Sequence, residues 1–127
     1  MVLDSSALVP VILDEAGSAA LLAKITAAPA VALGAPSLAE TLIVVRRLGG
    51  DAAAQLYELL REIDVKVIAF TEEHSRVALE AYLRFGKGRH PAALNFGECL
   101  SYAAATIAGQ PLMYLGNDFA QTDLASA

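Results

Sequence analysis

The chain has 127 residues, of which 56% are hydrophobic, and a formal net charge of −5 at pH 7. This length allows one domain, residues 1–127, that buries a continuous core without disulfides or structural metal. The single cysteine, Cys99, cannot form an internal bridge, and no secretory signal precedes the first apolar run, so we expect a cytoplasmic protein. The longest uncharged stretch is interrupted by polar residues, glycine and proline, which argues against a transmembrane segment.

Short apolar runs alternate along the chain with longer segments rich in alanine and leucine. This alternation predicts βα units around a parallel sheet, and therefore an α/β fold with four to five strands. Strands are predicted at residues 2–4, 31–35, 65–70 and 112–115. Helices are predicted at about residues 7–13, 18–27, 38–48, 52–63, 72–85 and 96–108.

Four carboxylates lie where predicted elements begin or end: Asp4, Glu40, Glu98 and Asp118. Ligands of a parallel sheet bind beyond the carboxyl ends of its strands, near the helix N-termini that follow. Asp4 ends a predicted strand, Asp118 follows another by a short loop, and the two glutamates lie in first turns of helices, so we expect all four at one sheet edge. Carboxylates gathered there repel one another, and Mg²⁺ or Mn²⁺, which prefer hard oxygen ligands, relieve that repulsion.

Each acid also has a purely structural explanation. Residues 37–40 and 95–98 fit capping boxes, with a serine and an asparagine as the respective caps. Asp118 could favour the positive end of a short helix, and Asp4 could accept N–H bonds from the turn that follows it. Asp4 fits this explanation least well, because it borders the first apolar run and an unpaired charge near the core is costly.

One dense basic cluster precedes the segment that carries Glu98, and it comprises Arg84, Lys87, Arg89 and His90. Once the four acids are set aside from the 14 acidic residues, ten remain against nine Lys and Arg, so the net charge does not exclude a nucleic-acid ligand. The cluster is interpreted either as a solvated face or as a contact for backbone phosphates through Arg84, Lys87 and Arg89.

The remaining chemically versatile side chains are not expected to carry the chemistry. His74 lies in the turn TEEHSR and is predicted at the surface. Tyr102 and Phe119 are predicted to pack in the core rather than to stack on bases. Cys99 has no second cysteine, which argues against a zinc or thiol mechanism.

The chain resembles the PIN-domain ribonucleases, and most closely the VapC-type toxins of toxin–antitoxin pairs. The resemblance is carried by MVLDSSALV at the start, by GKGRHPAALNFGECLSYAAA and by the closing PLMYLGNDFAQTDL, and it spans nearly the whole chain. It implies a three-layer α/β/α PIN-like domain. One position departs from the family pattern, since Glu98 stands where the family usually carries aspartate; this keeps the charge and lengthens the arm.

The resemblance implies a role for each acid. Asp4 and Glu98 are the central metal ligands, Asp118 completes the metal site, and Glu40 holds a second ion or orients the attacking water. Further residues match the family as possible supports of the site, with helix capping as the alternative: Ser6, Asn117 and Asp123.

The implied activity is that of a Mg²⁺- or Mn²⁺-dependent endoribonuclease, which cuts single-stranded or looped RNA by metal-activated water. The implied partners are a VapB-type antitoxin that blocks the pocket and a second copy of the chain, in a homodimer or in a heterotetramer or larger assembly with antitoxin. The antitoxin would dock on the leucine-rich segments 8–22 and 38–48. Two alternatives remain: a PIN-like RNA- or partner-binding module weakened by Glu98, and an aspartate-nucleophile phosphatase or dehalogenase. The latter generally needs a second acid where Ser6 stands.

Overall fold

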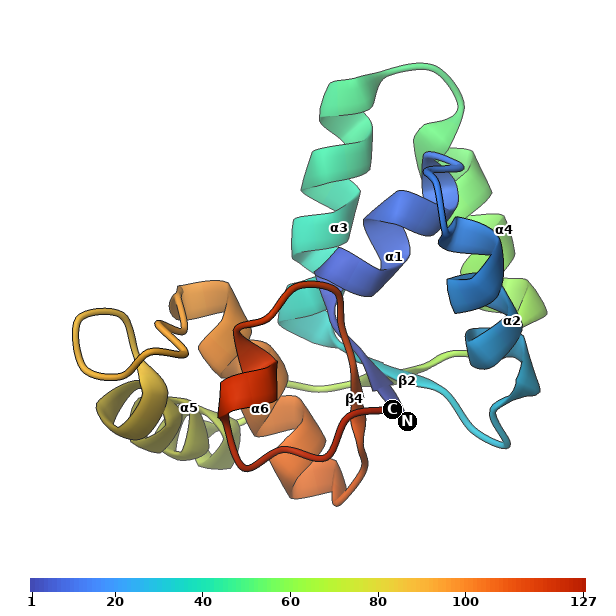
Figure 1. Cartoon of the computed structure of the whole chain (residues 1–127). Coiled ribbons are helices and arrows are strands. Elements are labelled where there is room, and N and C mark those ends of the chain that lie inside the picture. The colour runs from blue at the N-terminus through green and yellow to red at the C-terminus, as the bar shows by residue number, and fades with distance from the viewer.

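The computed structural model describes all 127 residues and contains a four-stranded, all-parallel sheet. Its strands, in the spatial order β3-β2-β1-β4, are β1 (Val2–Leu3), β2 (Ala32–Gly34), β3 (Lys66–Ile68) and β4 (Leu112–Met113). In register, Val2 lies between Ala32 and Leu112. The C-terminal tail adds a parallel bridge between Leu112 and Ser126, so both chain ends lie at this part of the sheet (Figure 1).

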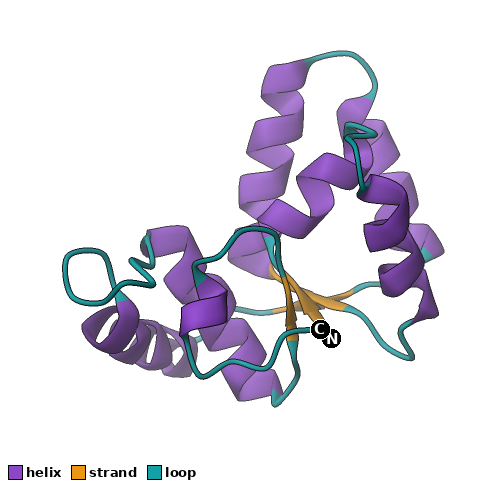
Figure 2. Ribbon diagram, in the orientation of Figure 1, coloured by secondary structure: helices purple, strands orange, loops and turns teal.

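Helices cover both faces of this sheet. They are α1 (Ser5–Ile12), α2 (Ser18–Ala27), α3 (Ala35–Leu48), α4 (Ala52–Glu62), α5 (Glu72–Phe85) and α6 (Phe96–Ala108), followed by the 3₁₀ turn η1 (Phe119–Gln121). Figures 1 and 2 show α5 and α6 on one side of the strands and α1 to α4 on the other. This is the predicted α/β class, with four strands. None of the helices combines the length and apolar character needed to cross a membrane.

The core is divided between the two faces of the sheet because successive strand residues point to opposite sides. Val2 and Leu112 belong to the cluster beneath α5 and α6, whereas Leu3 and Met113 belong to the cluster beneath α1 and α2. The strands β1 and β4 are buried on both faces and read as uninterrupted apolar runs, whereas the edge strand β3 is largely exposed and contains Lys66.

The helix bounds agree with the predicted ones for α2, α5 and α6, whereas α1 and α3 begin earlier than predicted. Helix α1 begins at Ser5 because the Asp4 side chain caps it, and α3 begins at Ala35 because Pro36 suits a first helical turn. The surface prediction for His74 is wrong. Its side chain is 5% exposed, and its Nδ1 accepts the Thr71 N–H at 3.2 Å in a capping box at the start of α5.

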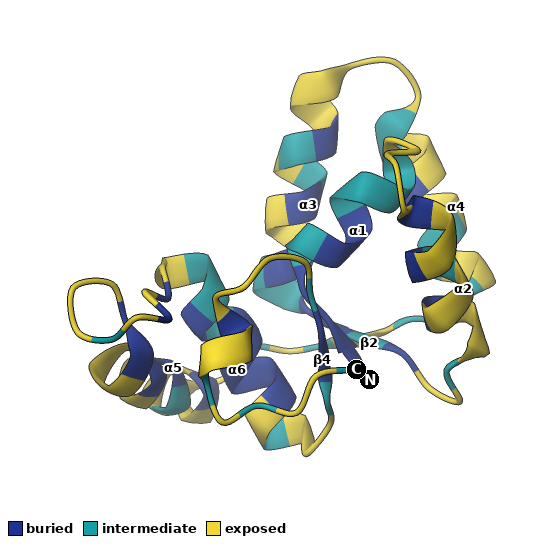
Figure 3. Ribbon diagram, viewed as in Figure 1, coloured by how far each residue is buried: buried dark blue, intermediate teal, exposed yellow.

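The apolar docking groove predicted over the early helices is not lined as expected. Leu8 and Leu21 are buried in the core cluster beneath α1 and α2, so they present no surface to a partner. The apolar side chains that remain exposed on α3 are Ile43 and Leu48. Figure 3 shows that the end of α3 far from the sheet is exposed.

Candidate functional site

Three of the predicted acids come together at the edge where β1 and β4 end. Asp4 directly follows β1, and its N–H donates to the Met113 carbonyl of β4 at 2.9 Å. Asp118 follows β4 by a short loop, and Glu98 lies in the first turn of α6. The pKa of Glu98 is raised, first by burial and further by the nearby charges of Asp118 and Asp4. Asp4 and Asp118 therefore both lie close enough to Glu98 to act on its charge.

Asp4 is held in a buried position, with 4% of the residue exposed. Its Oδ2 accepts the Ser6 N–H at 2.9 Å, and its Oδ1 accepts the Ser101 hydroxyl at 2.6 Å. The Ser101 Oγ lies 2.9 Å from the Ser37 Oγ, so the chain of hydrogen bonds continues from α6 into α3. Hydrogen bonds to both oxygens make burial of this charge tolerable, and each oxygen keeps a further lone pair for a ligand.

The loop that carries Asn117 and Asp118 is anchored at both ends. The Ser6 hydroxyl oxygen accepts the Leu115 N–H at 3.0 Å, which ties the start of α1 to the start of the loop. At the other end Phe119 is buried, with its ring centroid 5.1 Å from that of Tyr114, so the packing prediction for Phe119 is confirmed. Asp118 is itself exposed between these anchors and makes no capping bond to η1.

Glu98 folds back onto its own helix. Its Oε2 accepts the Asn95 N–H at 2.7 Å, while the Asn95 Oδ1 accepts the Glu98 N–H at 3.0 Å. The capping box predicted at residues 95–98 is therefore confirmed. The Asn95 bond lowers the pKa of Glu98, but burial and the neighbouring carboxylates outweigh it. Because Oε2 is engaged, Oε1 is the oxygen left to face Asp118 and Asp4.

Glu40 reaches the same region from α3. Its Oε2 accepts the Ser5 hydroxyl at 2.8 Å, and a Cβ at Gly97 would lie only 3.4 Å from its Oε1. The absence of a side chain at Gly97 thus lets the Glu40 carboxylate approach the start of α6. The capping box predicted at residues 37–40 is wrong, because α3 begins at Ala35 and the Ser37 hydroxyl pairs with Ser101 instead.

The donor set has the chemistry of a site for a hard cation, although no three of the acidic side chains stand close enough together to enclose one ion in this structure. All the donors are carboxylates, which suit Mg²⁺ and Mn²⁺. Burial raises the pKa of Glu98 most, and the charges of Asp118 and Asp4 raise it further; a cation relieves that repulsion. Glu98 is the acid of this set whose Oε2 is held by its own helix, through the Asn95 N–H.

A model of the PIN domain matches residues 1–124. The chain belongs to the PIN-domain family. Ribonuclease VapC36 of Mycobacterium tuberculosis is 47% identical to this PIN domain over 126 residues, which cover 98% of the chain and 91% of the relative. Ribonuclease VapC of Mycolicibacterium smegmatis is 39% identical over 127 residues, which cover 99% and 98% respectively. The VapC type suggested by the sequence motifs is thereby confirmed.

Solved structures agree with this assignment at the level of the fold. The sarcin-ricin loop cleaving toxin VapC20 of Mycobacterium tuberculosis matches this PIN domain with a TM-score of 0.78 at 19% identity, covering 99% of this chain and 97% of that one. A chain of a toxin–antitoxin complex from Klebsiella pneumoniae also matches with a TM-score of 0.78, at 12% identity and with 99% and 95% covered. The predicted PIN-like architecture is therefore confirmed.

In this PIN domain, Asp123 does not join the other acids. Its Oδ1 accepts the Tyr102 hydroxyl at 2.6 Å, and its Oδ2 accepts an N–H of Arg84 at 2.7 Å. These two donors lower the pKa of Asp123, whereas the hydrogen bond to Asp123 raises the pKa of Arg84. The prediction that Asp123 supports the metal site is corrected: it anchors the C-terminal tail to α5 and α6. Lys87 and Arg89 are exposed in the loop after α5, and their contact with phosphate stays a prediction, as it does for Arg84.

Sequence reasoning missed the serines that position the acids. Ser101 holds Asp4, Ser5 holds Glu40, and Ser37 supports Ser101. One signal for Ser101 was present, since it is the polar residue within the run CLSYAAA, three residues after Glu98. A buried polar group in such a run needs a hydrogen-bond partner, although the sequence does not say which.

Proposed function

We propose that this PIN domain is a divalent-metal-dependent endoribonuclease and the toxin of a toxin–antitoxin pair. The main observation behind the proposal is that Asp4, Glu98 and Asp118 lie at one sheet edge. Burial raises the pKa of Glu98 there, and the charges of the other two acids raise it further. The names of the relatives support it, because both VapC36 and the VapC of Mycolicibacterium smegmatis are described as ribonucleases.

Each residue of the site has a role in this proposal. Asp4, Glu98 and Asp118 hold Mg²⁺ or Mn²⁺, which when bound supplies Lewis acidity toward the scissile phosphate and toward water. Ser101 and the Ser6 N–H keep Asp4 in one orientation. Glu40, which is exposed and held by Ser5, orients the attacking water.

Glu98 would hold the cation once its Oε2 released the Asn95 N–H. The bond from the Glu98 N–H to the Asn95 Oδ1 would remain and keep the helix capped. An exposed backbone N–H at Asn95 is then free to bind water. The longer arm of glutamate, compared with aspartate, allows both states.

The macromolecular partners follow from the charges around this edge. RNA phosphate contacts Lys87 and Arg89, with Arg84 available only if it leaves Asp123, and Asn117 supports the carboxylate of Asp118. A VapB-type antitoxin places a basic side chain against the acids and so blocks the site. The toxin–antitoxin complex from Klebsiella pneumoniae supports such a partner, and we propose a homodimer as the form that binds it.

A second function, that of a PIN-like RNA- or partner-binding module without catalysis, is favoured by one observation. Glu98 is engaged as a cap, and no three acids enclose an ion. If the capped state persists in the presence of metal, the site lacks one of its ligands. The aspartate-nucleophile alternative receives no such support, because Ser6 stands where that chemistry generally needs a second acid.

Cleavage of a 5′-labelled single-stranded RNA with Mg²⁺, with Mn²⁺ and with chelator separates these functions. We expect metal-dependent cleavage that is lost in Asp4→Asn and in Asp118→Asn. Asp51→Asn is the matched control, because Asp51 is an exposed acid that makes no side-chain capping bond to α4. RNA binding without cleavage in either metal would identify the binding module. RNA ends are then mapped in cells after expression of the protein is induced, with cells that express Asp4→Ala as the control. Ends found only with the unmodified protein identify the target RNA.

A further inference from the structure

Phe96 is a large apolar side chain left in solvent beside the acids. It is 80% exposed, the highest fraction among the exposed large hydrophobic residues. It is the first residue of α6, directly after the Asn95 cap and two residues before Glu98. Core packing does not explain a ring in this position.

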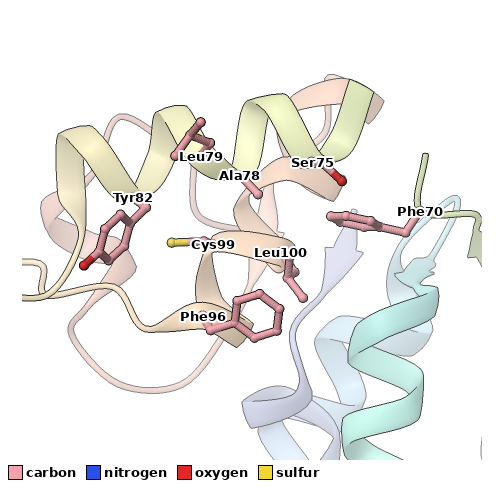
Figure 4. Close-up of a pocket in the computed structure, with 8 residues that line it drawn as sticks. All are labelled: Phe70, Ser75, Ala78, Leu79, Tyr82, Phe96, Cys99 and Leu100. Atoms are coloured by element: carbon pink, nitrogen blue, oxygen red, sulfur yellow. The ribbon is translucent and has the colours of Figure 1, made fainter. Parts of the chain in front are cut away.

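The ring lies between two grooves. The first runs between α5 and α6, holds about 560 Å³ and is almost wholly apolar, with Leu79 and Tyr82 of α5 facing Phe96 and Leu100 of α6 (Figure 4). The second, which we call the α3–α6 groove, holds about 450 Å³, and half of its lining residues are polar, glycine or proline. Its lining includes Glu40, Ile43, Arg47, Phe96, Gly97 and Leu100.

The α3–α6 groove leads from the acids to a cation. Glu40, Ile43 and Arg47 follow one another at helical spacing and so share one face of α3. Seven residues of helix separate Glu40 from Arg47, which is about 10 Å along the axis. Arg47 is exposed and takes part in none of the three ion pairs of the molecule. A guanidinium at this distance can bind the phosphate that neighbours the scissile phosphate in an RNA chain.

We propose that the α3–α6 groove binds the nucleotide adjacent to the scissile phosphate, with its base stacked on Phe96 and its phosphate on Arg47. This rests on the proposed function, because the acids define where the scissile phosphate lies. Aromatic side chains bind single strands by stacking on bases of any sequence, and arginine forms paired hydrogen bonds to phosphate. An apolar ring and a free cation in one groove match a nucleotide better than an apolar protein segment. The groove between α5 and α6, which is almost wholly apolar, suits such a segment better.

Fluorescence tests the stacking directly because the chain has no tryptophan. Phe96→Trp and Tyr57→Trp each give a single reporter; Tyr57 is a matched control, since it is 57% exposed on α4. Both are made in an Asp4→Asn background to prevent cleavage and are titrated with a short single-stranded RNA. We expect saturable quenching at position 96 and none at position 57. Unchanged emission at position 96 while RNA binds would overturn the proposal.

Affinity provides the second measurement. Phe96→Ala is expected to weaken RNA binding roughly 5- to 150-fold, Phe96→Trp to preserve it and Tyr57→Ala to leave it unchanged. Arg47→Gln is expected to reduce the slope of log affinity against log salt by about 1, with Arg61→Gln of α4 as the control. Equal affinities of Phe96→Ala and the parent would contradict the proposal.

Two outcomes separate this proposal from its alternatives. If Phe96→Trp is quenched and Phe96→Ala loses RNA affinity while the parent protein cuts no RNA, the nucleotide site is supported and the proposed activity is refuted. If the parent cuts RNA but position 96 is not quenched, the activity is supported and the nucleotide site is refuted. Sedimentation of Phe96→Ala identifies a protein contact. A changed mass with unchanged RNA affinity would assign Phe96 to an interface between two copies and refute the nucleotide site.

Discussion

Removing one buried hydroxyl, by Ser101→Ala, should weaken both the fold and the metal site. Ser101 is 1% exposed, and its hydroxyl donates to Asp4, itself 4% exposed, at 2.6 Å. Hydrogen bonds to charged groups contribute about 1.5–3 kcal/mol, so we expect the free energy of unfolding to fall by about 2 kcal/mol. Loss of a group that orients a metal-binding carboxylate typically weakens metal binding roughly 10- to 100-fold, and we expect a loss of that size for Mn²⁺.

Urea unfolding in chelator measures the first effect, and calorimetric titration with Mn²⁺ measures the second. Ser18→Ala is the matched control, because Ser18 is also buried but its hydroxyl lies 3.4 Å from the Asp14 carboxylate, at the limit of a hydrogen bond. Ser37→Ala keeps the bond between Ser101 and Asp4 and should lose less Mn²⁺ affinity than Ser101→Ala. Wild-type Mn²⁺ affinity in Ser101→Ala would refute the idea that this hydroxyl positions Asp4.

Four further outcomes are expected. Glu98→Asp, whose shorter arm leaves the Asn95 cap, should bind Mn²⁺ more tightly and raise nuclease activity; lower activity with both Mg²⁺ and Mn²⁺ would mean that the site is adapted to glutamate. Because the pKa of Glu98 is raised, protons compete with metal at a higher pH than for an ordinary glutamate, so calorimetry should find Mn²⁺ affinity falling as pH decreases through that pKa. The pKa of Asp123 is lowered, so its stabilisation is present above the ordinary aspartate pKa and is lost as pH falls through the lowered one. Tyr102→Phe should accordingly cost about 1 kcal/mol in urea unfolding at neutral pH and less in acid, and a difference independent of pH would contradict this. Replacing Lys87 and Arg89 by glutamine should weaken RNA binding and reduce the slope of log affinity against log salt by about 2. An unaltered slope would mean that the two residues form only a solvated face.

The sequence by itself determined the elements and the positions of the acids along them. Short apolar runs marked the strands, and helical spacing gave α2, α5 and α6 their bounds. The Asn95 to Glu98 capping box could be recognised because its partners lie three residues apart. These features depend on hydrogen bonds and periodicity within one or two turns of chain, which composition and spacing encode directly.

Tertiary structure decided which polar groups meet. The bond from Ser101 to Asp4 joins residues 97 positions apart, and it exists because α6 packs against β1. Asp123 matched the family pattern as well as Asp118 did, yet packing of the tail turns it to Arg84 and Tyr102. His74 looked exposed by its neighbours in sequence but is buried. For Ser101 and Asp123 the partner comes from a distant element, and no local pattern specifies how two such elements are oriented when the core closes.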